Sequence, residues 1–146
     1  MTGDRIQDSG FRGKSSVIDI ASKRVVIHSY KDLDVWKRSV NLVVTVYSLT
    51  KRFPKEELYT LVSQLRRSAI SIPSNIAEGH SKRATKDYIR FVNIAYGSLA
   101  ELETQLVISE KLNYLPAKDL EPLWEETKSI GRMLNGLISG LEKKLP

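Results

Sequence analysis

The sequence predicts an all-α protein, an antiparallel up-down-up-down four-helix bundle with a kinked second helix. Apolar residues recur at steps of three and four along four long segments, which is the period of one face of a helix. The connections between these segments are short, as they are between neighbouring antiparallel helices. The chain has 146 residues, of which 41% are hydrophobic, so it is long enough for one domain with a packed core.

Residues 1–29 are predicted to be a flexible N-terminal arm, followed by the four-helix bundle domain at 30–146. The arm holds Gly3, Gly10 and Gly13 and several serines, with short apolar patches at 17–20 and 25–27. A frayed tail is the favoured interpretation. The alternative is that these patches form a short strand or dock on a neighbouring subunit.

The first helix is expected from about Asp32 to Arg52. Its predicted core stripe consists of Leu33, Trp36, Val40, Val43 and Tyr47. The β-branched residues at 43–46 would also suit a strand. The periodic segment is far longer than a typical strand of about 5–6 residues, however, so its length favours a helix.

The second helix is expected after Phe53 and Pro54, because proline disfavours the α conformation in the residue before it. Its apolar stripe consists of Leu58, Leu61, Leu65, Ala69, Ile72 and Ile76. The stripe keeps its phase across Pro73, so a kink is expected there rather than an end. Gly79 is the expected terminator.

The third helix follows a polar and basic linker at 80–84, where Ser81 or Thr85 can cap it. Its stripe consists of Tyr88, Phe91, Ala95, Leu99, Leu102 and Leu106. Pro116 separates it from the fourth helix. The stripe of that helix consists of Leu120, Leu123, Thr127, Ile130, Leu134, Leu137 and Leu141.

Composition excludes several classes of protein. Without cysteine the chain forms no disulfides or thiolate metal sites, which fits a reducing cytoplasm. The first 13 residues are polar and no apolar run approaches about 20 residues, so neither secretion through such a leader nor a membrane span is expected. We therefore predict a cytoplasmic protein.

The sequence offers no support for catalysis. A di-iron site in a bundle needs Glu-x-x-His motifs, and neither His28 nor His80 has a glutamate three residues before it. Glu101 and Glu103 point to different faces of their helix, which argues against a shared acid–base role. No catalytic residue, metal or cofactor is predicted.

Basic residues suggest a binding surface instead. The formal net charge is +6, with the excess toward the N-terminal side. Lys82, Lys86 and Arg90 recur every fourth residue and share a face near a helix start, where anions are favoured. The candidate phosphate contacts are Arg66, Arg67, Lys82, Arg83, Lys86 and Arg90. The alternative is a solvated face with Asp87 as its counter-charge.

A second set of apolar residues lies off the predicted core stripes. It consists of Leu42, Val46, Leu49 and Ile70. Two apolar faces need two partners, so these residues are the candidate interface of a homo-oligomer. A wide intramolecular core that absorbs both faces is the alternative.

Several segments resemble a known bacterial family of four-helix bundles, the proteins encoded in intervening sequences of 23S ribosomal RNA. They are 30–36 (Tyr-Lys-Asp-Leu-Asp-Val-Trp), 64–69 (Gln-Leu-Arg-Arg-Ser-Ala), 71–79 (Ser-Ile-Pro-Ser-Asn-Ile-Ala-Glu-Gly) and 97–104 (Gly-Ser-Leu-Ala-Glu-Leu-Glu-Thr). The resemblance covers about residues 30–145. The segment at 71–79 is its most specific part, and the extension before Tyr30 departs from the usual family start.

This resemblance implies a bundle that assembles as a ring, commonly a pentamer. It also implies distant relatives that are accessory proteins of reverse transcriptases in diversity-generating retroelements, where a basic oligomer binds nucleic acid. Two hypotheses follow. The first is a non-catalytic homo-oligomer that binds the RNA or DNA backbone. The second is an oligomeric scaffold for a protein partner such as a reverse transcriptase.

Overall fold

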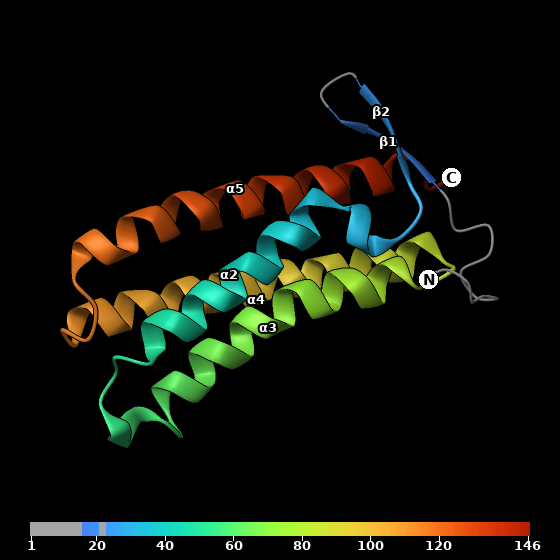
Figure 1. The fold of residues 1–146 in the computed structure, drawn as a ribbon. Helices are drawn as coiled ribbons and strands as arrows, with labels where there is room; N and C mark the ends of the chain where they lie inside the picture. Colours follow the sequence, from blue (N-terminus) through green and yellow to red (C-terminus); the bar gives the residue numbers. More distant parts are fainter. Residues whose placement is uncertain (1–15, 21–22) are drawn as a thin grey trace.

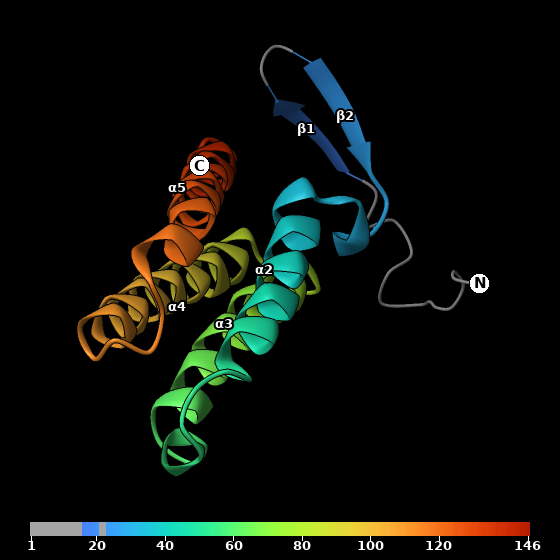
Figure 2. The same ribbon diagram turned by 60° about the vertical axis from the view of Figure 1, so that its left-hand side comes forward.

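The computed structural model describes residues 16–20 and 23–146, and it confirms the predicted helical bundle (Figure 1). The long helices are α2 (Asp34–Thr50), α3 (Leu61–His80), α4 (Thr85–Lys111) and α5 (Ala117–Glu142). The short elements are the strands β1 (Ser16–Ile20) and β2 (Lys23–Ile27) and the 3-10 turns η1 (Tyr30–Asp32) and η2 (Lys55–Glu57). Figure 2 shows α3 beside both α2 and α4, with α5 beyond α4.

The strands form an antiparallel hairpin at one end of the bundle (Figure 2). Val17 pairs with Val26 in its register, and both side chains are exposed, whereas Ile27 is buried. The apolar patches of the arm thus adopt the strand conformation that was the alternative interpretation. The flexibility of the arm stays a prediction, and residues 1–15, 21 and 22 lie outside the described residues.

A local hydrogen-bond network orders the segment between β2 and α2. The Asp32 carboxylate accepts from the backbone N–H groups of His28, at 3.0 Å, and of Ser29, at 3.2 Å. The Ser29 hydroxyl in turn accepts from the N–H of Lys31 at 3.2 Å. These bonds satisfy the backbone donors at the start of η1, which leads directly into α2.

The core stripe of α2 is not the one predicted. Its buried residues are Val35, Ser39, Leu42, Val46 and Thr50, and most of the predicted stripe is only partly buried. The assignment of Leu42 and Val46 to an oligomer interface is therefore wrong, because both are at most 2% exposed inside their own bundle. Leu49 packs against the same core. The buried hydroxyls of Ser39 and Thr50 donate to backbone carbonyls of their own helix, so two polar residues fit a core stripe.

Helix α3 continues through Pro73, which is buried in its interior. The bend expected at this proline stays a prediction. Gly79 does not end the helix, which runs to His80. Its role is close packing, since a Cβ atom at Gly79 would lie 2.9 Å from Cβ of Phe91 and 3.0 Å from Cδ1 of Tyr88. The glycine therefore lets α3 and α4 approach each other.

The buried stripes of α4 and α5 follow the prediction closely, and a polar seam accompanies the apolar contact between α3 and α4. The hydroxyl of Ser68 donates to Gln105 Oε1 at 2.7 Å. The hydroxyls of Ser71 and Ser98 lie 2.7 Å apart, and Asn75 Nδ2 donates to Ser71 at 2.9 Å. The Ser68–Gln105 and Ser71–Ser98 bonds link the two antiparallel helices at two levels, whereas the Asn75 bond lies within α3.

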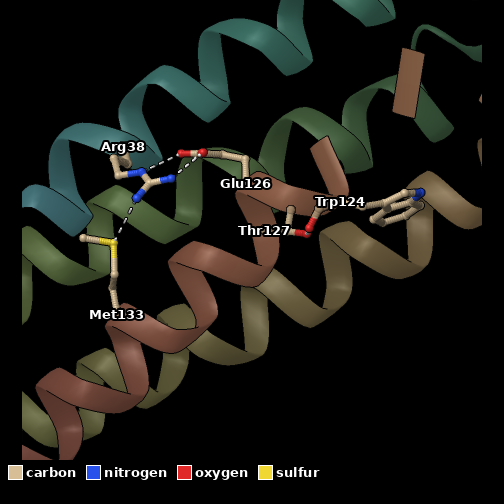
Figure 3. Close-up of polar contacts among 5 residues, drawn as sticks. All are labelled: Arg38, Trp124, Glu126, Thr127 and Met133. Carbon is tan, nitrogen blue, oxygen red and sulfur yellow. Dashed lines mark hydrogen bonds and ion pairs between the residues drawn. The ribbon is translucent and has the colours of Figure 1, made fainter. Parts of the chain in front are cut away.

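Ion pairs connect helices α2 and α5 at their partly exposed edge. The Arg38 guanidinium donates to both carboxylate oxygens of Glu126, at 2.7 and 3.0 Å, and contacts Met133 Sδ at 3.8 Å (Figure 3). Arg52 pairs with Asp119 at 2.6 Å. A groove of about 550 Å³ separates the two helices, and Leu42, Leu49 and Leu123 contribute to its lining.

Candidate nucleic-acid interface

The turn between α3 and α4 carries the predicted basic cluster, organised around one aromatic ring. Lys82 Nζ lies 5.1 Å from the centroid of the Phe91 ring, and Arg90 Cζ lies 4.5 Å from it. Lys82 Nζ is also 4.0 Å from a Glu78 carboxylate oxygen. Phe91 is only 9% exposed, so the packing of α4 fixes the ring and the ring helps to place two cations.

The other two cations of this turn, Arg83 and Lys86, are exposed. We use the name basic turn for Lys82, Arg83, Lys86 and Arg90. Helix α4 begins beside them, and its N-cap residue, Ala84, has no side-chain oxygen to cap the first N–H groups. The positive end of the helix dipole therefore adds to the field of the side chains, and Asp87 in the first turn opposes it in part.

The structure does not bring Arg66 and Arg67 into this group. They lie about 15 residues before Lys82 along α3 and its C-terminal turn, which is roughly 20 Å at 1.5 Å per residue. Arg66 Nε donates to Thr50 Oγ1 at 3.0 Å, and its guanidinium carbon lies 4.4 Å from the centroid of the Tyr47 ring. Arg66 therefore links α3 to α2, whereas Arg67 is exposed. The six candidate phosphate contacts therefore divide into the four residues of the basic turn and the distant pair Arg66 and Arg67.

An apolar surface lies on the outer side of α2 and α3, and part of it is the stripe of α2 that the sequence predicted as core. We call it the α2–α3 surface, and it consists of Trp36, Val40, Val43, Val44, Tyr47 and Ile70. Val44 is 64% exposed and Ile70 is 41% exposed. Ile70 belongs to it because it lies one turn from Arg66, which contacts Tyr47.

Beneath the basic turn lies an aromatic pair formed by His80, which is buried, and Tyr88, which is partly buried. The rings of His80 and Tyr88 meet edge to face, with centroids 5.7 Å apart. The Tyr88 hydroxyl is buried without a hydrogen-bond partner, and burial raises the pKa of this phenol well above its ordinary value. Tyr88 therefore stays neutral and serves packing.

The described part of the chain holds neither a metal-binding cluster nor a membrane-spanning helix. Within it, no group of three or more His, Cys, Asp or Glu side chains is placed to hold a metal ion. None of the helices that the structure describes is long and apolar enough to cross a membrane.

The profile of the 23S rRNA-intervening sequence protein family matches residues 31–136. The chain belongs to this family. The match confirms the resemblance drawn from the segments beginning at Tyr30, and it leaves the β1–β2 hairpin outside the shared region.

A solved structure supports the same assignment for this intervening-sequence protein. The fold of this chain is similar to the 1.70 Å crystal structure of a protein with unknown function from the S23 ribosomal protein family of Bacteroides thetaiotaomicron. The two share 25% sequence identity and a TM-score of 0.67, over 72% of this chain and 95% of the other. A comparison with curated protein sequences gives no match. The comparisons establish the family and the fold of the chain, and neither the name of the family nor that of the crystal structure refers to a reaction.

Proposed function

We propose that this intervening-sequence protein is a non-catalytic homo-oligomer that binds the phosphate backbone of RNA or DNA through the basic turn. The observation that carries the proposal is the placement of Lys82 and Arg90 by the buried Phe91 ring, with Arg83 and Lys86 exposed beside them. Cations held in place lose less side-chain entropy when they contact an anion than free ones do.

Recognition of this kind reads charge and not base sequence. Each phosphate neutralised by a lysine or arginine releases condensed counterions, so affinity falls steeply with salt. If all four cations of the basic turn contact duplex phosphates, the slope of log affinity against log salt is about −3.6 for each protomer. Such contacts position a protein on nucleic acid without specifying sequence.

Assembly would multiply a weak site. The α2–α3 surface replaces Leu42 and Val46 as the proposed interface. Its residues Val44 and Ile70 are exposed in the single chain and the others are only partly buried, whereas Leu42 and Val46 are buried. Several basic turns held in one ring raise one another's effective concentration, so avidity exceeds the affinity of one turn. A ring of five is what the family resemblance implies.

The proposal is tested by charge reversal on the basic turn. The variant Lys82→Glu/Lys86→Glu/Arg90→Glu is titrated with a labelled RNA hairpin and a matched DNA duplex at two salt concentrations. We expect binding to be lost while helicity, measured by circular dichroism, is retained.

A matched control reverses three exposed lysines elsewhere on the surface. They are Lys37, Lys51 and Lys55. This variant has the same net charge as the test variant and should lose far less affinity. If both variants bind equally well, the basic turn is not the contact surface.

The α2–α3 surface also favours a second candidate function, an oligomeric scaffold for a protein partner such as a reverse transcriptase. This candidate predicts an oligomer, measured by size-exclusion chromatography with light scattering, that binds neither nucleic acid at low salt. Salt-sensitive binding of either nucleic acid counts against it.

A further inference from the structure

A second basic site lies away from the basic turn, in a groove of about 310 Å³ between α4 and α5. Leu99, which is 3% exposed, and Gly131 lie at its base. Tyr96 forms one wall, and its hydroxyl meets Asn135 Nδ2 at a long 3.5 Å. A Cβ atom at position 131 would lie 3.9 Å from Tyr96 Cε1, so the glycine leaves room beside the ring. Tyr96 is 41% exposed, which is high for a ring that lies against a neighbouring helix.

Charged side chains surround this aromatic wall. Lys128 and Arg132 are exposed and lie four residues apart on α5, about 6 Å along the helix axis. Glu103 from α4 lines the groove and is half-buried. In the described part of the chain, no ion pair engages either of these cations. The groove thus combines an aromatic ring, a hydrogen-bond acceptor and two cations.

We infer that this groove takes one unpaired base of a single-stranded nucleic acid, with the base against Tyr96 and the flanking phosphates on Lys128 and Arg132. The inference rests on the proposed function and adds the form of nucleic acid that is bound. Every base has a π face, so stacking on an aromatic side chain combined with backbone cations suits single strands of any sequence.

Glu103 decides between a base and a phosphate inside the groove. A carboxylate repels a phosphate but accepts a hydrogen bond from the exocyclic amino group of a base. The phosphates therefore lie at the outer cations, and a base enters. In a duplex the bases are stacked and paired, so they are not free to enter the groove.

The groove and the basic turn can be reached by one strand. Helices α4 and α5 are antiparallel neighbours, so the start of α4 and the end of α5 lie at the same end of the bundle (Figure 1). Tyr96 is six residues beyond Arg90 on α4, about 9 Å along the axis. Arg132 lies nearer to that end of α5 than Lys128 does. A strand that leaves the basic turn toward α5 meets the groove next.

The test compares one RNA oligonucleotide as a single strand and as a duplex, by fluorescence anisotropy with the full chain. For Tyr96→Leu we expect about tenfold weaker binding of the single strand and unchanged binding of the duplex. Tyr96→Phe keeps the aromatic face and should bind like the wild type. The matched control is Tyr59→Leu, because Tyr59 is 87% exposed and lies outside the groove.

A second variant does not depend on the tyrosine. Lys128→Gln/Arg132→Gln should make the single-strand salt slope shallower by about 1.4, which is 0.7 for each lost phosphate contact. If Tyr96→Leu binds the single strand as tightly as the wild type does, or loses equal affinity for the single strand and the duplex, the groove is not a base-binding site. The proposed function is unaffected by either result. A wild-type protein that binds neither form overturns both.

Discussion

Gly79→Ala tests how closely α3 must approach α4. Alanine is favoured over glycine in a helix interior by about 1 kcal/mol, so in open space this change stabilises a helix. At Gly79 the new Cβ would meet Phe91 Cβ at 2.9 Å and the Tyr88 carbonyl oxygen at 3.2 Å. Both atoms are rooted in the backbone of α4 and cannot rotate away. Overpacking of this kind costs about 1–3 kcal/mol, so we expect a net loss of about 1 kcal/mol.

The matched control is Gly97→Ala on α4. A Cβ at Gly97 has nothing within 4 Å, so this variant should gain up to about 1 kcal/mol. Both variants are unfolded in urea and followed by far-ultraviolet circular dichroism at one protein concentration, because oligomerisation makes stability depend on concentration. The two midpoints should move in opposite directions. If Gly79→Ala stabilises the protein as much as Gly97→Ala, the close approach is not what this glycine is for.

Three further predictions follow from single features. Leu42→Ala should lower the free energy of unfolding, measured in urea, by about 2–5 kcal/mol, and Val40→Ala should lower it by less than about 1 kcal/mol. The reverse order would mean that the core stripe of α2 is the one predicted from the sequence. Val44→Glu should dissociate the oligomer in light scattering, whereas an intact oligomer would remove the α2–α3 surface from the interface. Hydrogen bonds from Thr60 and Tyr114 hold the pKa of the Glu57 carboxyl below its ordinary 4.5. These bonds therefore stabilise the fold above pH 4.5, and their contribution is lost as the pH falls through the lowered pKa. Tyr114→Phe should narrow the difference in stability between neutral and acid pH, and an unchanged difference would contradict this account.

The sequence sufficed for the fold because helix period and short connections depend on neighbours along the chain. The predicted stripes of α4 and α5 match their buried faces for this reason. In α2 two apolar stripes lie side by side, and the choice between them depends on where α3 and α5 pack. Ser39 and Thr50 counted as polar in the sequence, yet their hydroxyls donate to their own helix and can be buried.

Some features of the candidate site could be predicted from the sequence, whereas others depend on how the helices pack. Lys82, Lys86 and Arg90 share a face because they lie on successive turns, which spacing alone predicts. That Arg66 is directed to Tyr47 depends on how α2 and α3 pack, and no linear pattern contains that information. Tyr96 was missed because it lies off the core stripe of α4. The groove beside it exists only once α5 is in place.

The seam between α2 and α5 shows how little exposed ion pairs contribute to the stability of this bundle. Its two ion pairs, Arg38 with Glu126 and Arg52 with Asp119, are partly exposed, and each such pair contributes about 0–1 kcal/mol. These pairs therefore influence which helices lie side by side, whereas α2 stays in the bundle because Val35, Leu42 and Val46 are buried in the shared core.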